Sequence, residues 1–167
     1  EAAATGNLGI ALGALGKLAE AQACHERYAE LARRNGDRKG EAHAIGNFGV
    51  VLCRLGRYAE AESLLGRQLR IACEIGDRLG ESMASGNLGL AAWSQGRIDE
   101  ARARIERQVE LAREIGDREG EVLGIGNLGL VFSVLSRAAE ALECFERQLS
   151  LAREIGNPRS EAVGSCN

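Results

Sequence analysis

The sequence has no long apolar run and no excess of one charge sign. No apolar stretch approaches the roughly 18 residues that a membrane-spanning helix requires. The 21 basic and 24 acidic residues are interleaved along all 167 positions and leave a formal net charge of −3. Because no basic surface is expected, we predict no nucleic acid and no membrane among the partners. The chain also lacks an initiator methionine and a leader segment, which predicts a fragment of a longer protein.

Cysteine pairs and histidine clusters are missing as well. The five cysteines form no Cys-x-x-Cys pair, and their odd number argues against a closed disulfide framework. They are Cys24, Cys53, Cys73, Cys144 and Cys166. The two histidines, His25 and His43, belong to no cluster of metal-ligating residues. The sequence therefore predicts reduced thiols that act as small apolar residues in a cytoplasmic protein, without a metal site.

Catalytic signatures are absent too. No nucleophile has a base and an orienting partner outside the repeated positions, and neither a phosphate-binding loop nor a pair of catalytic acids is present. The recurring string Gly-Asn-Leu-Gly lies within a predicted helix, so it is not a dinucleotide-binding loop. We therefore predict that the chain is not an enzyme and binds no cofactor. The charged residues are expected to form an ordinary solvated surface.

In place of these features the sequence has a repeat with a period of 40 residues. The string Gly6-Asn7-Leu8-Gly9 returns in every unit without a gap. Its later copies are Gly46-Asn47-Phe48-Gly49, Gly86-Asn87-Leu88-Gly89 and Gly126-Asn127-Leu128-Gly129. We therefore expect one repeat domain over residues 1–167, with units 1–40, 41–80, 81–120 and 121–160 and a truncated fifth unit at 161–167.

Each unit is predicted to form two helices, which in the second unit cover about 38–55 and 58–75. Good helix formers fill both segments, and Gly56 and Gly76 follow them at positions where glycine often ends a helix. The residues expected to cap the first helices are Asp37, Asp77, Asp117 and Asn157.

One helix pair cannot bury both of its apolar stripes, so neighbouring pairs must stack. The predicted fold class is all-α, an α-solenoid of stacked antiparallel helix pairs. A glycine in a helix interior costs about 1 kcal/mol relative to alanine. The return of glycines such as Gly46 and Gly49 in every unit therefore predicts a close approach of two helices, with Ala61 as the small partner on the second helix.

Leu-Gly in a first helix and Ala-x3-aromatic in a second helix are typical of the tetratricopeptide repeat. Leu8-Gly9, Leu128-Gly129 and the pair Ala141 and Phe145 match this pattern, so the chain resembles that family. The resemblance implies a right-handed superhelix that binds other proteins. The tryptophan of the family pattern is missing, and its position holds Thr5, Ile45, Ser85 and Ile125. The terminal proline is also missing, and its position holds Arg33, Cys73, Arg113 and Arg153.

A subclass of this family is suggested by the 40-residue period and by the strings Gly-Asn-Leu-Gly and Leu-Ala-Arg-Glu-Ile-Gly-Asp. These features resemble the long repeat of the Partner-of-Inscuteable (Pins/LGN) spindle-orientation scaffolds, which also occurs in many large signalling proteins. The resemblance covers essentially the whole chain. It is specific for the fold rather than for one partner.

The resemblance implies that the first helices line a concave groove, in which a row of asparagines often holds the backbone of an extended peptide. The matching residues are Asn7, Asn47, Asn87 and Asn127, with Asn167 at the truncated end. Asparagine is a poor residue for a helix interior, and its amide can both donate and accept hydrogen bonds. Such a row suits a peptide of any sequence. The alternative is that each amide bonds a neighbouring helix within the solenoid.

Groove positions that change between units are expected to set the specificity for a ligand. They are His43, Val50, Arg54, Met83, Leu90, Trp93 and Leu130. Trp93 is either a binding hot spot or the filling of a gap beside Ala92 in the core. Arg54 either meets an acidic residue of the ligand or remains solvated. The recurring glutamines, expected to bond between helices, are Gln68, Gln108 and Gln148.

These patterns lead to a main hypothesis and one alternative. The main hypothesis is a non-catalytic scaffold that binds an extended, partly acidic segment of another protein in its concave groove. The alternative is a structural spacer or self-association module of a larger signalling protein, since apolar stacking faces at the two ends could join copies end to end. The asparagine row favours binding, because a spacer needs no regular row of amides.

Overall fold

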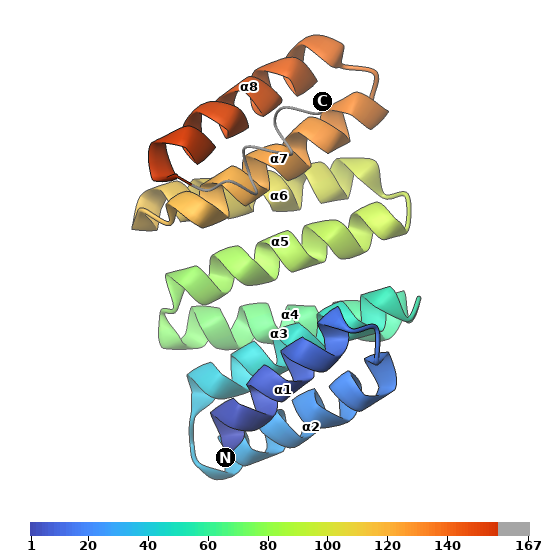
Figure 1. Cartoon of the computed structure of the whole chain (residues 1–167), viewed down its shortest axis with the longest axis vertical. Helices are drawn as coiled ribbons and strands as arrows, with labels where there is room; N and C mark the ends of the chain where they lie inside the picture. The colour runs from blue at the N-terminus through green and yellow to red at the C-terminus, as the bar shows by residue number, and fades with distance from the viewer. Residues whose placement is uncertain (157–167) are drawn as a thin grey trace.

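The computed structural model describes residues 1–156, and all regular elements in this range are helices (Figure 1). The eight helices are α1 (Ala2–Ala14), α2 (Leu18–Arg34), α3 (Arg38–Arg54), α4 (Tyr58–Ile75), α5 (Arg78–Ser94), α6 (Ile98–Ile115), α7 (Arg118–Val134) and α8 (Ala138–Ile155). The predicted fifth unit at 161–167, the cap at Asn157 and the row position at Asn167 lie outside the described residues.

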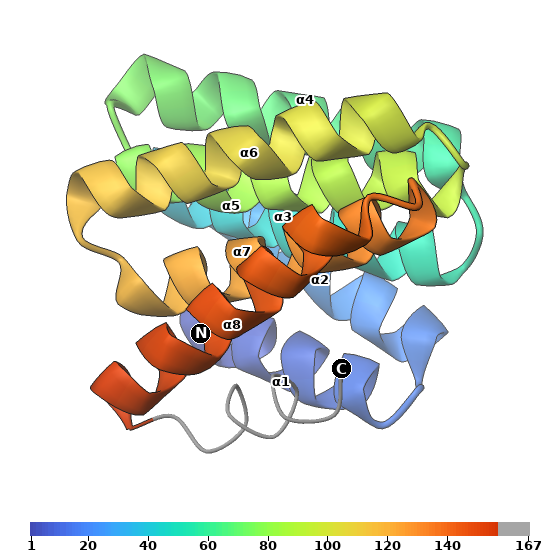
Figure 2. The same cartoon turned by 90° about the horizontal axis from the view of Figure 1, so that it is seen from above.

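Consecutive helices pack as antiparallel pairs, and the pairs stack along the long axis of the molecule (Figure 1). Each first helix contacts the second helix of its own unit, and α2, α4 and α6 each contact the next first helix. Seen from above, α4 and α6 form a layer separate from α3 and α5 (Figure 2). The first helices α1, α3, α5 and α7 also contact one another in succession. The predicted all-α solenoid of stacked helix pairs is confirmed.

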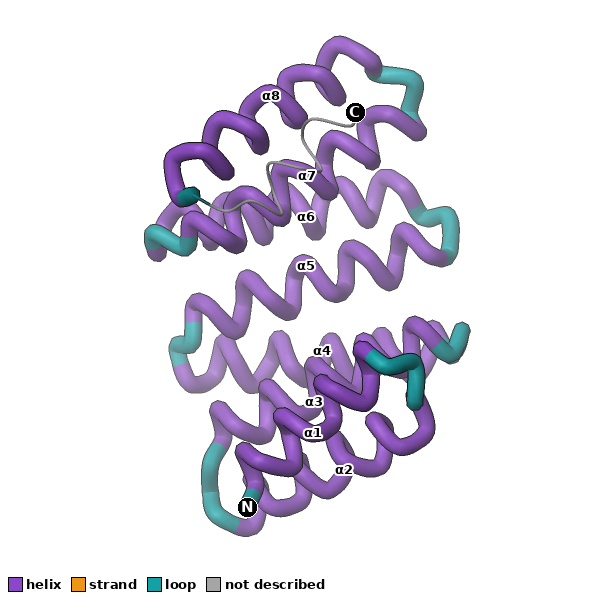
Figure 3. Tube along the Cα trace, in the orientation of Figure 1, coloured by secondary structure: helices purple, strands orange, loops and turns teal. Residues whose placement is uncertain are grey.

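The helix boundaries follow the predicted signals, and short turns connect the helices (Figure 3). Gly76 adopts the left-handed conformation, with φ of 68°, directly after α4, which is the glycine position expected at a helix end. The Asp37 side chain caps α3 by accepting a hydrogen bond of 2.8 Å from the Gly40 backbone N–H. Asp77 makes no such cap, and its carboxylate lies 3.4 Å from Lys39 Nζ.

The repeated glycines bring each first helix close to the second helix of its own unit. A Cβ atom added at Gly46 would lie 2.5 Å from Gln68 Cδ, and one added at Gly49 would lie 2.6 Å from Leu65 Cδ2. The predicted close approach is therefore correct, but large side chains face the glycines, and Ala61 contributes only its carbonyl oxygen, 3.5 Å away from the added atom at Gly49. The corresponding pairs elsewhere are Gly6–Tyr28, Gly9–His25, Gly86–Gln108, Gly89–Ile105, Gly126–Gln148 and Gly129–Phe145.

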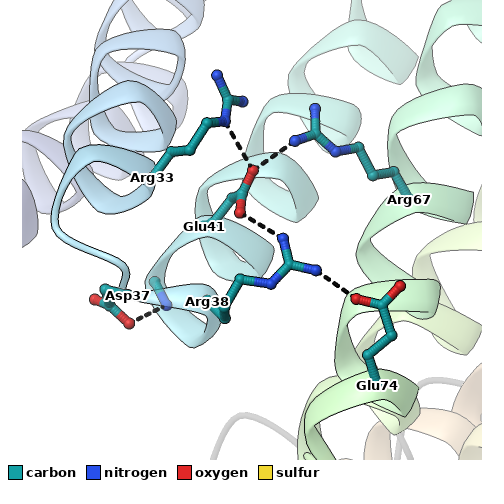
Figure 4. A network of polar contacts seen from close by, with 7 residues as sticks. Arg33, Asp37, Arg38, Glu41, Arg67 and Glu74 are labelled. Carbon is teal, nitrogen blue, oxygen red and sulfur yellow. Dashed lines mark hydrogen bonds and ion pairs between the residues drawn. The ribbon is translucent and has the colours of Figure 1, made fainter.

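A buried carboxylate connects three helices at the joint between the first two units (Figure 4). Glu41 of α3 is 1% exposed and accepts hydrogen bonds from Arg33 of α2 at 3.1 Å, from Arg38 of α3 at 2.9 Å and from Arg67 of α4. Arg38 also pairs with Glu74 near the end of α4. Burial alone would raise the pKa of Glu41, but the hydrogen bonds from Arg33 and Arg38 and the charge of Arg67 outweigh it and lower the pKa.

The later joints repeat this arrangement with fewer arginines. Glu121 accepts hydrogen bonds from Arg113 and Arg118 at 2.8 and 3.3 Å. Among the described residues, Glu81 pairs with Arg78 alone. Cys73 stands here at the position that Arg33 and Arg113 occupy beside the other two glutamates. The prediction of an ordinary solvated surface is therefore wrong for these glutamates, which packing between units buries.

We predict that Cys73→Arg strengthens the joint at Glu81. The new guanidinium would approach the buried carboxylate as Arg33 approaches Glu41, and an added partly exposed ion pair contributes about 0.5–1 kcal/mol. The change should raise the urea midpoint followed by circular dichroism. Cys73→Ser is the control, since it removes the thiol without adding charge. Equal midpoints for the two variants would contradict the expectation.

Candidate functional site

The four asparagines of the repeated motif lie on the first helices, each directly after a glycine that packs onto a second helix. Asn47, Asn87 and Asn127 are half-buried, and Asn7 is exposed. Within residues 1–156, none of these four side-chain amides forms a hydrogen bond. The bonds to neighbouring helices that the alternative requires are thus absent from the described part of the chain.

A hollow of about 360 Å³ opens between α3 and α5. It is lined by Val50, Cys53, Arg54, Asn87, Leu90, Trp93 and Ser94. Five of the site residues predicted from the sequence meet there. All of the lining residues belong to first helices, so the hollow lies on the face that those helices form.

A second hollow of about 200 Å³ lies between α1 and α3. It is lined by Gly9, Ile10, Gly13, Ala14, His25, Asn47, Val50, Val51 and Arg54. Val50 and Arg54 line both hollows, so the two are neighbours along one face. Of the other predicted residues, Met83 and Leu130 are exposed, and His43 is half-buried. The buried Nε2 atom of His43 has no hydrogen-bond partner in the part of the chain that the structure describes.

A row of exposed apolar side chains accompanies the asparagines. One member follows each asparagine by three residues, close to one helical turn. The exposed fractions are 55% for Ile10, 38% for Val50, 45% for Leu90 and 46% for Leu130. We call these four side chains the apolar row. Exposed apolar surface in a regular array is typical of a site that contacts a partner.

Arg54 is tied to the neighbouring unit. Its Nη1 atom donates a hydrogen bond of 2.6 Å to the carbonyl oxygen of Gly13 near the end of α1. Arg54 nevertheless remains exposed, so both roles predicted for it, contact with an acidic ligand and solvation, stay predictions. The Gly13 carbonyl oxygen also accepts a hydrogen bond of 3.0 Å from the Gly16 backbone N–H. The partial negative charge at the C-terminal end of a helix favours the approach of a guanidinium.

Trp93 contacts the core, whereas its role as a binding hot spot stays a prediction. Its half-buried side chain packs against the core cluster that includes Ile105 and Val122, and it also lines the hollow between α3 and α5. His25, by contrast, is a core residue that is 2% exposed, and burial lowers the pKa of its imidazole.

Within residues 1–156, the side-chain amides of the recurring glutamines make none of the predicted hydrogen bonds between helices, although the backbone carbonyl of Gln108 accepts one of 3.1 Å from Ser82 Oγ. Each is at least nine-tenths buried, yet its Oε1 atom has no hydrogen-bond partner. Their side chains instead pack against the glycines Gly46, Gly86 and Gly126. The residues concerned are Gln68, Gln108 and Gln148.

The sequence did not predict a third hollow of about 320 Å³ beside α6, α7 and α8. Its lining includes Val109, Leu128 and Cys144. Leu64, which occupies the matching position of α4 two units earlier, packs against the core there. The smaller side chain of Cys144 at the equivalent position was the signal that could have revealed this hollow.

Two further findings concern cofactors and membranes. In the described range 1–156, no three or more His, Cys, Asp or Glu side chains gather where a metal ion could bind. None of the helices in that range is long and apolar enough to cross a membrane.

Sequence comparison assigns the fold to a family. The family described as "Tetratricopeptide repeat" matches residues 1–74 and again 40–114. The chain belongs to the tetratricopeptide repeat family. No curated protein matches the chain in sequence. The narrower Pins/LGN-like subclass stays a prediction.

Solved structures share the fold of this tetratricopeptide repeat chain at low sequence identity. Aspartyl phosphate phosphatase F from Bacillus subtilis has a TM-score of 0.89 and 12% identity, covering 98% of this chain and 43% of its own. The Rap conjugation gene regulator of plasmid pLS20, in complex with the Phr* peptide, has a TM-score of 0.90 and 16% identity, covering 98% and 45%. A signal transduction ATPase with a tetratricopeptide repeat sensor from Pyrococcus horikoshii has a TM-score of 0.77 and 18% identity, covering 98% and 26%. The chain therefore spans less than half the length of each.

Proposed function

We propose that this tetratricopeptide repeat domain is a non-catalytic, cytoplasmic scaffold that binds an extended segment of another protein in the groove formed by its first helices. The observation that carries the proposal is the row of asparagine amides that form no hydrogen bond to any of the described residues 1–156. Each amide offers one acceptor and two donor hydrogens, which suits the N–H and C=O groups of a peptide backbone. The two hollows between neighbouring first helices give such a segment room.

One structural neighbour supports a peptide ligand. The Rap regulator of plasmid pLS20 has this fold and was solved in complex with the Phr* peptide. At 16% identity the similarity concerns the fold, so the peptide of that protein does not identify the ligand of this one.

The alternative, a spacer or self-association module, draws on the apolar surface of α1. Leu8 is 54% exposed and Leu15 is 75% exposed, whereas Phe48 and Leu88 at the position of Leu8 are half-buried against other helices. A second copy could cover this surface in an end-to-end stack. The asparagine amides, which have no hydrogen-bond partner within residues 1–156, favour ligand binding over this alternative.

The test is a random peptide library presented to the wild-type protein and to the double variant Asn47→Ala/Asn87→Ala. We expect the double variant to lose at least about tenfold in affinity for the selected peptides, because each lost amide removes hydrogen bonds worth about 0.5–1.5 kcal/mol. Alanine is the better helix former, so the variant should keep its helical circular dichroism spectrum.

Asn35→Ala is the matched control, since Asn35 is an exposed asparagine that follows α2 outside the groove. Its affinity should equal that of the wild type. Selected peptides that bind the double variant as tightly as the wild type would refute the amide row. A library without any binder would refute the proposed function itself.

A further inference from the structure

The hollow between α1 and α3 has a polar lining that the stacking of the units does not require. It includes the side chains of His25, Asn47 and Arg54, and none of its lining residues is acidic. The corresponding residues are Leu65, Asn87 and Ser94 at the next joint, and Ile105, Asn127 and Val134 at the one after it. Because leucine and isoleucine pack onto the second glycine of the motif at those joints, the histidine at the first joint is not needed for packing.

His25 is a buried histidine without a hydrogen bond to the described residues 1–156. Its side chain is 2% exposed, and its Nδ1 atom is buried and has no partner in that range. Burial lowers the pKa of the imidazole, so the neutral ring offers one N–H donor and one acceptor nitrogen. A buried polar group without a partner is unfavourable, so a ligand that bonds to this ring supplies an interaction that the fold lacks.

Arg54 is a cation without a carboxylate partner in the described part of the chain. Its Nη1 atom donates to the Gly13 carbonyl oxygen, which is not ionised. A guanidinium has five N–H donors in a planar fork that matches a carboxylate, so donors remain for a ligand. Lys39, near the start of α3, differs because its Nζ atom lies 3.4 Å from the Asp77 carboxylate.

Asn47 adds an amide donor to the same hollow. Asn47 and Arg54 lie about two helical turns apart on α3, so their side chains share one face of that helix, and His25 approaches from α2. The volume of about 200 Å³ is smaller than the roughly 300–1,000 Å³ of sites for separate small molecules. The hollow therefore suits a single side chain of a bound segment.

We propose that the hollow between α1 and α3 binds one acidic side chain, aspartate or glutamate, of the extended segment that the groove holds. This inference rests on the peptide-binding function proposed above and fixes the place of one ligand residue. The carboxylate accepts hydrogen bonds from the Arg54 guanidinium, the Asn47 amide and the His25 imidazole. The later joints, which lack the histidine and the arginine, do not select an acid there.

The peptides selected from the random library, synthesised with an amidated C-terminus and a fluorescent label, test the proposal. We expect the selected peptides to share an aspartate or glutamate at one position. Replacing that residue by asparagine or glutamine should lower the affinity about tenfold in fluorescence anisotropy, because the hydrogen bonds to a charged group are lost. If a free C-terminal carboxylate restores the affinity of this amide peptide, the hollow binds a chain terminus and the proposal is wrong.

Two variants locate the acid in the hollow. Arg54→Ser and His25→Leu introduce the residues that Ser94 and Leu65 provide at the same positions of other units, so both variants should keep the helical circular dichroism spectrum. Arg54→Ser should bind the acidic peptide about tenfold more weakly, and His25→Leu about threefold more weakly. Neither variant should change the affinity for the amide peptide.

Arg70→Ser is the matched control for the loss of one positive charge. Arg70 is an exposed arginine of α4 without an ion pair in the described range, and it lies outside both hollows of the groove. This control should bind the acidic peptide as the wild type does. Equal losses of Arg54→Ser for the acidic and the amide peptide would show a merely structural effect and overturn the inference.

The outcomes separate this inference from the proposed function. If library peptides bind through Asn47 and Asn87 but the acidic and amide peptides bind with equal affinity, the inference fails and the proposed function stands. Wild-type affinity of Arg54→Ser for the acidic peptide would also overturn the inference. A library without any binder would overturn the proposed function and, with it, this inference.

Discussion

Gly49→Leu is expected to lower the free energy of unfolding by about 3 kcal/mol. The leucine Cβ alone would lie 2.6 Å from Leu65 Cδ2, and the rest of the side chain would have to enter space that Leu65 already fills. Because Leu65 is fully buried, it cannot rotate into solvent, so α3 and α4 must separate. Urea unfolding followed by circular dichroism measures the loss.

Gly66→Ala is the matched control for this prediction. Gly66 lies in the interior of α4, and a Cβ atom added there would meet only the end of Arg70, with Nη1 at 3.9 Å. Without a clash, the better helix propensity of alanine should raise the free energy of unfolding by about 0.5–1 kcal/mol. Opposite signs for the two variants would support the packing argument, whereas a wild-type midpoint for Gly49→Leu would disprove it.

Glu41→Gln is expected to cost about 2 kcal/mol, the second largest effect. The substitution keeps the shape of the side chain but removes the negative charge that three arginines contact. Hydrogen bonds to charged groups contribute about 1.5–3 kcal/mol, and the partial exposure of the arginines places this case toward the lower end. Because the network spans α2, α3 and α4, its loss should loosen the joint between the first two units.

Glu81→Gln is the comparison within the same chain. Glu81 occupies the same place in the next unit but pairs with Arg78 alone among the described residues, so its substitution should cost about 1 kcal/mol or less. Equal losses for the two variants would mean that the arginines around Glu41 contribute nothing beyond the first.

The same carboxylates give the protein a defined response to acid. The pKa values of Glu41 and Glu121 are lowered in the folded chain, so their stabilising contribution is complete above the ordinary glutamate pKa of about 4.3. It is lost as the pH falls through the lowered pKa values. In Glu41→Gln, part of this acid-dependent loss should disappear, so the two stability profiles should converge at low pH.

Most of the fold could be predicted because its signals are local and recur in each unit. Glycine at a helix end, as at Gly76, and aspartate before a first helix, as at Asp37, depend only on nearby backbone. The wrong assignment of Ala61 had a different cause. A glycine in a sequence indicates space for a neighbour but not its size, and only the packing reveals that Leu65 and Gln68 fill that space.

The candidate site was less predictable because its details depend on contacts between units. The hydrogen bond from Arg54 to Gly13 joins residues 41 positions apart, and it depends on how α1 and α3 pack. The burial of Glu41 likewise requires α2, α3 and α4 together. Periodicity gave the positions of the asparagines and the apolar row, whereas it could not reveal which polar side chains already have partners.

The absence of a side chain at the repeated glycines has an evolutionary consequence. The side chains that pack onto the second glycine of each motif differ widely, while the position that receives them never changes. They are His25, Leu65, Ile105 and Phe145. Because a glycine has no side chain of its own to match, mutation of the opposing residue needs no compensating mutation in the first helix. Gene duplication can therefore lengthen such an array by whole helix pairs, and each new copy can diverge on one side without disturbing the other.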